Sequence, residues 1–214
     1  MKNGGLNLLK KSLESANVYF GKDEGTRESE FLKEFSNQIL ADNGGSWHSP
    51  PYKLKLNLYQ RQLRDLFISS FDDKECWGFK NDNTILIMNL WQAGLSNATP
   101  IGIFRHPNQL VTIYKSKYNF PVKLTYKLWV YYNRKMLSMY EEKPFPIIEL
   151  ENKRSRYNRA VVNAFKELGL ENQPKNIQLP RGSRAQLERR EMTKDVARLY
   201  RRLRQIKVKV ITEE

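Results

Sequence analysis

The fold prediction starts from the stretch Pro100-Ile101-Gly102-Ile103-Phe104-Arg105-His106-Pro107, near the middle of the chain. Residues 100–104 form a short apolar run of the kind found in buried strands. Arg105 and His106 end this run, and Pro107 suits the first turn of a helix, where its missing N–H has no helical partner. Apolar side chains then recur at helical spacing, at Leu110, Ile113 and Tyr114. This stretch predicts a strand that leads directly into a helix.

Two further strands are expected, one on each side of this stretch in the sequence. Residues 76–80 and 145–150 are also short apolar runs, whereas residues 84–91 fit a strand or a helix equally well. Helical spacing of apolar residues predicts helices over residues 6–16, 31–40, 56–71, 122–140, 160–168 and about 185–206. Strands interleaved with helices are typical of a parallel sheet covered on both faces. We therefore expect an α/β fold, in one domain spanning residues 1–214.

Two basic residues stand where predicted strands end. Lys80 closes the run 76–80, and Arg105 closes the run 100–104. Parallel sheets bind ligands beyond the carboxyl ends of their strands. Two cations that converge there would suit a ligand rich in phosphate.

The formal net charge of +14 is the strongest compositional signal. It favours an anionic partner, such as a phosphorylated nucleotide, a nucleic acid, an acidic glycan or a membrane surface. The excess is densest between Arg181 and Val210, where eleven cations face three acidic residues. A dedicated binding surface and an ordinary solvated helix face are both compatible with this pattern.

Other classes of protein are disfavoured by what the sequence lacks. No apolar run is long enough to cross a bilayer, and the N-terminus has no apolar core of a signal peptide, so a cytoplasmic location is expected. Cys76 is the only cysteine, and we expect it to be buried beside Trp77. With His48 and His106 as the only histidines, a zinc site is not expected.

Several short motifs occur in an order that is similar to the bacterial sulfotransferase family. They are Gly44-Gly45-Ser46-Trp47 before Pro50-Pro51, Trp77-Gly78-Phe79-Lys80, Phe104-Arg105-His106-Pro107, the set Trp129, Tyr132, Asn133 and Arg134, and Leu199-Tyr200-Arg201-Arg202-Leu203. Each motif is weak alone, but together they extend over nearly the whole chain. The chain therefore resembles enzymes that use 3'-phosphoadenosine 5'-phosphosulfate (PAPS) as sulfuryl donor.

This resemblance implies a three-layer α/β/α fold of the P-loop NTPase-like type, with no metal. Family members bind the 5'-phosphosulfate with a loop that follows a first strand. Here the aligned loop residues begin at Lys2, so we expect this first strand to be missing.

The resemblance also assigns roles to individual residues. Lys2, Gly4 and Gly5 are expected to hold the 5'-phosphosulfate, because backbone N–H groups at a helix N-terminus attract anions. Arg105 is expected to hold the 3'-phosphate, with Thr112 nearby because Ile113 replaces the usual serine. Lys80 is expected to stabilise the charge of the transition state. Glu28 is the candidate general base, and His48 is the second candidate.

Three functions remain open from the sequence. The first is sulfuryl transfer from PAPS to a hydroxyl or amine of an unknown acceptor, which could be a carbohydrate, a lipid or a small molecule. The second is an impaired homologue that only binds or scaffolds, because the loop has Asn3 and Leu6 where the family has a basic residue and a hydroxyl. The third is a nucleic-acid-binding module that uses the basic C-terminal helix. The aromatic stripe of residues 129–140 is expected to be core packing rather than a base-stacking platform.

Overall fold

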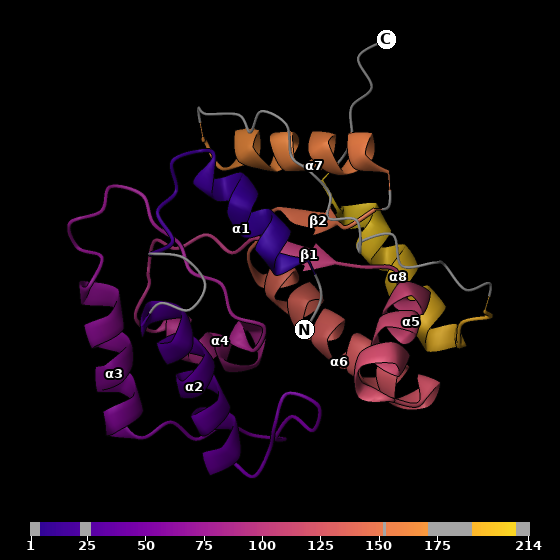
Figure 1. Cartoon of the computed structure of the whole chain (residues 1–214), viewed down its shortest axis with the longest axis horizontal. Coiled ribbons are helices and arrows are strands. Elements are labelled where there is room, and N and C mark those ends of the chain that lie inside the picture. Colours follow the sequence, from indigo (N-terminus) through magenta and orange to yellow (C-terminus); the bar gives the residue numbers. More distant parts are fainter. Residues whose placement is uncertain (1–4, 22–26, 152, 171–189, 209–214) are drawn as a thin grey trace. The chain divides into compact units, whose positions relative to one another are not determined.

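A computed structural model describes residues 5–21, 27–151, 153–170 and 190–208. The described chain divides into two compact units, one of residues 17–98 and one of residues 5–16 with 99–208. The structure is mixed α/β and mostly helical (Figure 1). Its elements are α1 (Leu6–Glu14), α2 (Arg27–Asp42), α3 (Leu58–Ser69), the 3₁₀-helix η1 (Thr84–Ile87), α4 (Met88–Gln92), β1 (Gly102–Phe104), α5 (Pro107–Tyr118), α6 (Val122–Glu142), β2 (Ile147–Glu149), α7 (Arg154–Glu167) and α8 (Lys194–Ile206).

The unit of residues 5–16 and 99–208 is built around a parallel pair of strands. β1 pairs with β2, so that Gly102, Ile103 and Phe104 stand opposite Ile147, Ile148 and Glu149. The chain crosses from one strand to the other through α5 and α6, as parallel pairing requires. A Cβ at Gly102 would lie 2.9 Å from Met136 Sδ of α6, which explains why glycine begins this strand. Helix α7 packs against β2.

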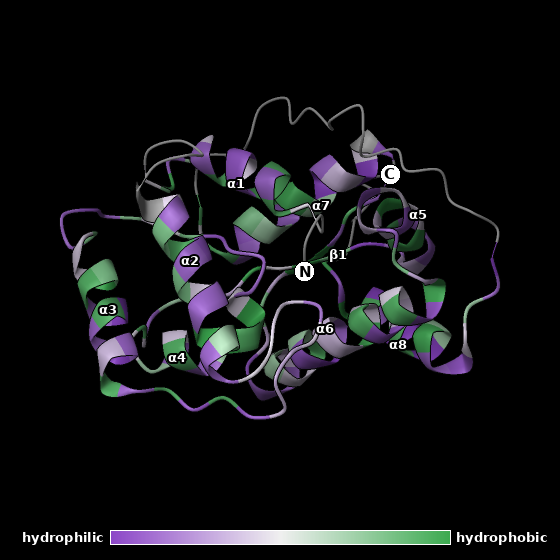
Figure 2. Ribbon diagram, turned by 60° about the horizontal axis from the view of Figure 1, so that its bottom comes forward, coloured by the Kyte–Doolittle hydropathy of each residue, from purple (hydrophilic) through white to green (hydrophobic). Residues whose placement is uncertain are grey.

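Amphipathic helices complete the core of this unit. The side chains of Trp129, Tyr114, Tyr157, Phe104 and Phe165 are fully buried there. α8 buries Val196, Leu199 and Leu203 and exposes its charged residues. Hydrophilic and hydrophobic segments accordingly alternate along α8 in Figure 2. The C-terminal helix is therefore folded onto the core through its apolar stripe.

The core of the unit of residues 17–98 combines buried aliphatic residues, such as Ile39 and Leu40, with a group of contacting aromatic rings. Phe67 of α3 contacts the rings of Phe71, Phe79 and Trp91, with centroids 5.2, 5.9 and 5.7 Å away. Helix α3 begins with a capping box, in which Asn57 Oδ1 accepts from Gln60 N at 2.8 Å and Asn57 N donates to Gln60 Oε1 at 3.1 Å. This box satisfies backbone groups that a helix start otherwise leaves without partners.

Most expected elements are confirmed. The strands over 100–104 and 145–150 are β1 and β2, and helices occupy the six expected regions as well as the segment that begins at Pro107. The ambiguous segment 84–91 is helical, as η1 and α4. The expected aromatic stripe of α6 is core packing, since Trp129, Tyr132 and Met136 are buried.

Three expectations are wrong. Residues 76–80 form no buried strand, but only a single parallel bridge between Tyr19 and Trp77. Cys76 is exposed rather than buried. The C-terminal helix begins at Lys194, because residues 190–193 are described and are not helical, whereas residues 185–189 lie outside the described chain.

The sheet of the described residues has two strands, so the finer prediction of a three-layer, P-loop-like fold with a missing first strand stays a prediction. Among the described residues, no helix is both long and apolar enough to span a membrane.

Candidate functional site at the carboxyl edge of the parallel strands

Arg105 lies where the resemblance places a phosphate ligand, directly after β1. Its backbone oxygen accepts a hydrogen bond from Trp129 Nε1 at 2.9 Å, which ties the end of β1 to α6. The residue is only 5% exposed. Burial lowers the pKa of its guanidinium to about 10, so the side chain remains a cation at neutral pH. In such a poorly solvated place a cation interacts with an anion more strongly than it does in water.

His106 turns the chain from β1 into α5. Its Nδ1 accepts a hydrogen bond from Asn108 N at 3.1 Å, so the imidazole caps the helix. Pro107 follows as the first helical residue. Burial lowers the pKa of His106, while Glu149 opposes that shift and Arg204 adds to it. These contacts indicate a structural role for His106 as a helix cap.

Gly5 brings the N-terminus of α1 to the same pair of strands. It precedes α1 with a φ of 105°, which L side chains rarely adopt. A Cβ on Gly5 would lie 2.5 Å from Leu150 Cδ2 and 3.1 Å from Ile103 Cδ1. Leu150 follows β2 directly and extends the pairing, because its N–H donates to Phe104 O at 2.8 Å. The start of α1 therefore packs on residues that adjoin the carboxyl ends of both strands.

Thr112 belongs to the same unit, on the second turn of α5. It is half-buried, and its Oγ1 donates to the backbone oxygen of Asn108 at 3.3 Å. Asn108 Oδ1 in turn accepts from Tyr126 OH at 2.7 Å. The beginning of α5 is thus fixed to α6, and Ile113 beside Thr112 is half-buried too.

A buried carboxylate that the sequence analysis did not single out also lies at this edge. Glu149, the last residue of β2, is 6% exposed and accepts a hydrogen bond from Tyr200 OH at 2.6 Å. Lys207 forms an ion pair with Glu149 and donates to Glu151 Oε1 at 2.7 Å. Arg204 Nε lies 3.6 Å from Glu149 Oε2. We call Glu149, Glu151, Tyr200, Arg204 and Lys207 the Glu149 network.

The surroundings shift the pKa values of two members of the Glu149 network, Glu151 and Tyr200. Burial alone would raise the pKa of Glu151, but Lys207 and Arg156 outweigh it and lower that pKa. Burial and the neighbouring Glu149 raise the pKa of Tyr200, so its hydroxyl stays a donor. The ring of Tyr200 also packs edge-on against His106, with centroids 4.7 Å apart. The network therefore fixes α8 next to the residue that follows Arg105.

The remaining predicted site residues lie outside the described residues or belong to the unit of residues 17–98. Lys2 and Gly4 lie outside the described residues, and Glu28 lies in the first turn of α2 with a side chain that is not described. Lys80 belongs to the unit of residues 17–98 and ends no strand. It is half-buried beside Asn81, whose Oδ1 accepts from Ser36 Oγ at 3.1 Å and thereby ties this loop to α2. His48 is exposed in a turn, in contact with Ser46.

Metal ligands do not cluster in the described parts of the chain, where no group of three His, Cys, Asp or Glu side chains could hold an ion. No protein-family model, curated protein or solved structure matches the chain.

Proposed function

We propose that this protein binds PAPS and transfers its sulfuryl group to a hydroxyl or amine of an acceptor. The proposal rests on one observation: the Gly5-capped start of α1 and the buried cation Arg105 both adjoin the carboxyl edge of the parallel strands. The motifs that resemble sulfotransferases assign the two phosphate-binding elements to these same residues. A helix N-terminus and a guanidinium are the two protein groups best suited to a doubly phosphorylated nucleotide.

Each residue would have a simple task. The backbone at Gly5, with Lys2 and Gly4, would bind the 5'-phosphosulfate. The first N–H groups of a helix have no carbonyl partner within it and could donate hydrogen bonds to the phosphosulfate oxygens. Arg105 would pair with the 3'-phosphate, and Thr112 carries a hydroxyl one residue before the position of the family's serine. Neither element needs a metal to bind phosphate.

The transfer itself exchanges one bond to sulfur for another. The acceptor oxygen or nitrogen forms a bond to sulfur as the bond between sulfur and the bridging phosphate oxygen breaks, leaving adenosine 3',5'-bisphosphate. The resemblance alone assigns the acceptor's proton to Glu28 and the negative charge on the bridging oxygen to Lys80. Both residues belong to the other compact unit.

A binding function without catalysis is the second candidate. Leu6 is the first residue of α1, at a position where the resemblance leads one to expect a hydroxyl, and Ile113 replaces the usual serine on α5. Neither apolar side chain can donate to a phosphate or sulfate oxygen. The nucleotide would then bind through backbone groups and Arg105 alone.

A thermal-shift titration with adenosine 3',5'-bisphosphate tests the proposal. Wild-type protein should melt at a higher temperature as the nucleotide is added. Arg105→Gln should lose most of this rise, whereas Arg198→Gln, on the exposed face of α8, should keep it. No rise for the wild type contradicts both candidates. A rise without transfer of labelled sulfuryl from PAPS to any of a panel of alcohols and amines favours the binding-only candidate.

A further inference from the structure

A long stretch of the chain carries cations but no acidic residue. Between Asp82 and Glu141 the sequence contains no Asp or Glu, and this stretch includes all of α5 and nearly all of α6. Lys115, Lys123, Lys127 and Arg134 are exposed there. Because no carboxylate is available within the stretch, these charges can be balanced only by other parts of the molecule or by a partner.

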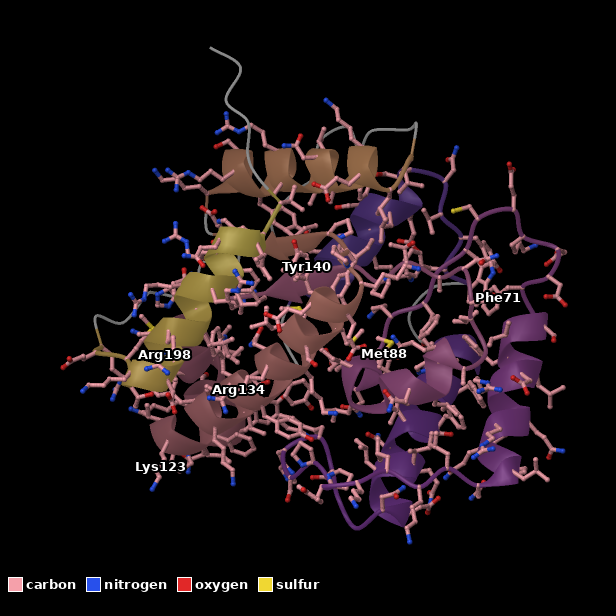
Figure 3. All side chains as sticks on the ribbon, turned by 180° about the vertical axis from the view of Figure 1, so that it is seen from behind. Phe71, Met88, Lys123, Arg134, Tyr140 and Arg198 are labelled. Carbon is pink, nitrogen blue, oxygen red and sulfur yellow. The ribbon has the colours of Figure 1, made fainter. Side chains whose placement is uncertain are left out.

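Packing fixes the direction of these cations. α6 contacts both α5 and α8, and the three helices bury Tyr114, Trp129 and Leu199 in the core. Each of the three helices therefore exposes its polar face to solvent. The cations Lys123, Lys127 and Arg134 of α6 and Arg198, Arg201 and Arg202 of α8 are all exposed, and we call these six the basic helix face. Figure 3 shows Lys123, Arg134 and Arg198 on one side of this unit.

The basic helix face is poorly neutralised within the protein. Arg202 has a counterion, because its Nη2 lies 3.6 Å from Glu141 Oε1. Lys123, Lys127, Arg134 and Arg198 take part in none of the ion pairs found among the described residues. By contrast, Lys207, which directly follows α8, is bound by the carboxylates of Glu149 and Glu151. Arg204 and Lys207 are thus paired with carboxylates, whereas four cations of the basic helix face have no ion pair among the described residues.

A half-exposed aromatic ring lies on α6 between these cations. Tyr131 occupies the turn between Lys127 and Arg134, and Lys135 Nζ lies 5.7 Å from the centre of its ring. Burial raises the pKa of Tyr131, so the phenol stays neutral. Cations on both sides of a neutral aromatic ring match the surfaces that hold a phosphate backbone and a stacked base.

We propose that the basic helix face binds single-stranded nucleic acid through its phosphodiester backbone. The mixture of Arg with Lys suits phosphate oxygens, which a guanidinium contacts in a bidentate manner. A membrane fits less well. Helices that lie in a bilayer surface insert an apolar face, whereas α6 and α8 bury theirs in the core. The large apolar side chains that are exposed among the described residues, Tyr52, Leu58, Tyr59 and Leu66, belong to the other compact unit.

This binding is independent of the proposed nucleotide site. Arg105 is buried and follows β1, whereas the six residues of the basic helix face are exposed on α6 and α8. Excess adenosine 3',5'-bisphosphate should therefore leave an oligonucleotide bound, and Arg105→Gln should not weaken it. Failure of one proposal consequently says nothing about the other.

Fluorescence anisotropy with a labelled single-stranded RNA of about 16 nucleotides tests the proposal. Wild-type protein should bind at low salt, with an affinity that falls steeply as salt rises from about 50 to 200 mM. The double variant Lys123→Gln/Arg198→Gln removes two cations of the basic helix face. It should bind more weakly and should reduce the slope of log affinity against log salt by about 1.4, since each lost contact contributes about 0.7.

Lys53→Gln/Arg61→Gln is the matched control, because it removes one Lys and one Arg from exposed positions of the other unit. It should keep the wild-type slope. Equal losses in the two double variants would mean that net charge alone attracts the RNA, and would overturn the proposal. Binding of vesicles that contain anionic lipid, or of heparin, without binding of RNA or single-stranded DNA would overturn it as well.

Discussion

At the scale of single residues, the contacts of Glu149 show how a buried carboxylate is accommodated. Taking an ionised carboxylate out of water is costly unless hydrogen bonds and opposite charges replace the water. Tyr200 and Lys207 both contact Glu149, and Arg204 lies close to it. All three residues come from the C-terminal part of the chain. The end of β2 and the position of α8 therefore depend on each other.

Tyr200→Phe removes one donor from Glu149 and leaves the ring packing in place. We expect the free energy of unfolding to fall by about 1.5–3 kcal/mol, the range for hydrogen bonds to charged groups. Urea denaturation measures this loss. Tyr131→Phe is the matched control, because it removes the same hydroxyl from a half-exposed ring that has no hydrogen bond among the described residues, and it should cost much less. Equal costs would show that the bond to Glu149 adds no stability.

His106 predicts a dependence of stability on pH. Its pKa in the folded protein lies below its ordinary value of 6.5, mainly because of burial. When the pH falls through 6.5, the unfolded chain therefore binds a proton before the folded chain does. The free energy of unfolding should fall between about pH 7 and 5.5 for this reason.

His106→Asn should make the stability less dependent on pH in this range, because asparagine also caps helices but does not titrate. Chemical denaturation of both proteins at pH 7 and at pH 5.5 measures the difference. An identical loss of stability in wild type and variant would contradict the assignment of this pH dependence to His106.

Contacts between distant residues could not be predicted from the sequence. The hydrogen bond from Tyr200 to Glu149 joins residues 51 positions apart, and no spacing rule connects them. The predicted end of a strand near residue 150 was the available signal for Glu149, just as the end of the run 100–104 pointed to Arg105. Cys76 was expected inside for its residue type, yet its exposure depends on how the neighbouring backbone turns.

At the scale of elements, local patterns predicted helices better than strands. The stripes of α6 and α8 recur at helical spacing, and the structure buries Trp129, Tyr132, Leu199 and Leu203 as that spacing requires. A strand also needs a partner, which its own sequence does not contain. The apolar segment 76–80 has the composition of a strand, but its rings, Trp77 and Phe79, pack against Phe67 instead. The ring centroids of Trp77 and Phe71 lie 4.4 Å apart, and within the described chain the backbone of this segment forms one isolated bridge, to Tyr19.

At Gly5, the start of α1 combines an unusual backbone conformation with close packing. Gly5→Ala would place a Cβ against buried Leu150 and would hold alanine at a φ of 105°. Gly44→Ala also imposes a positive φ, of 70°, but its Cβ would meet nothing within 4 Å. We expect a loss of about 1–3 kcal/mol from strain at either site, and an additional loss at Gly5 from the overlap with Leu150.

Urea denaturation of both glycine variants measures this difference in stability. Because Gly5 caps the helix end proposed to hold phosphosulfate, Gly5→Ala should also weaken binding of adenosine 3',5'-bisphosphate, and Gly44→Ala should not. Equal stability and equal nucleotide affinity of the two variants would mean that the start of α1 does not pack as described.

At the scale of the whole molecule, the α/β character was predictable and the size of the sheet was not. The β1–α5–α6–β2 crossover follows from the order of apolar runs and helical stripes along the sequence. The number of strands that pair in a sheet depends on contacts between segments, which composition and periodicity do not encode. The charge of +14 was equally plain from the sequence. Only the packing of α6 and α8 distinguishes the exposed basic helix face from the cations within the Glu149 network, Arg204 and Lys207.

The most direct test compares the affinities of two nucleotides by isothermal titration calorimetry. Adenosine 3',5'-bisphosphate and adenosine 5'-monophosphate differ only in the 3'-phosphate, which Arg105 is proposed to bind. Wild-type protein should bind the bisphosphate at least about tenfold more tightly, a difference of about 1.4 kcal/mol that is ordinary for a charge-assisted hydrogen bond. In Arg105→Gln this preference should disappear, while the weaker affinity for the monophosphate persists. An equal affinity of the wild type for both nucleotides, or a preference that Arg105→Gln retains, would contradict the account.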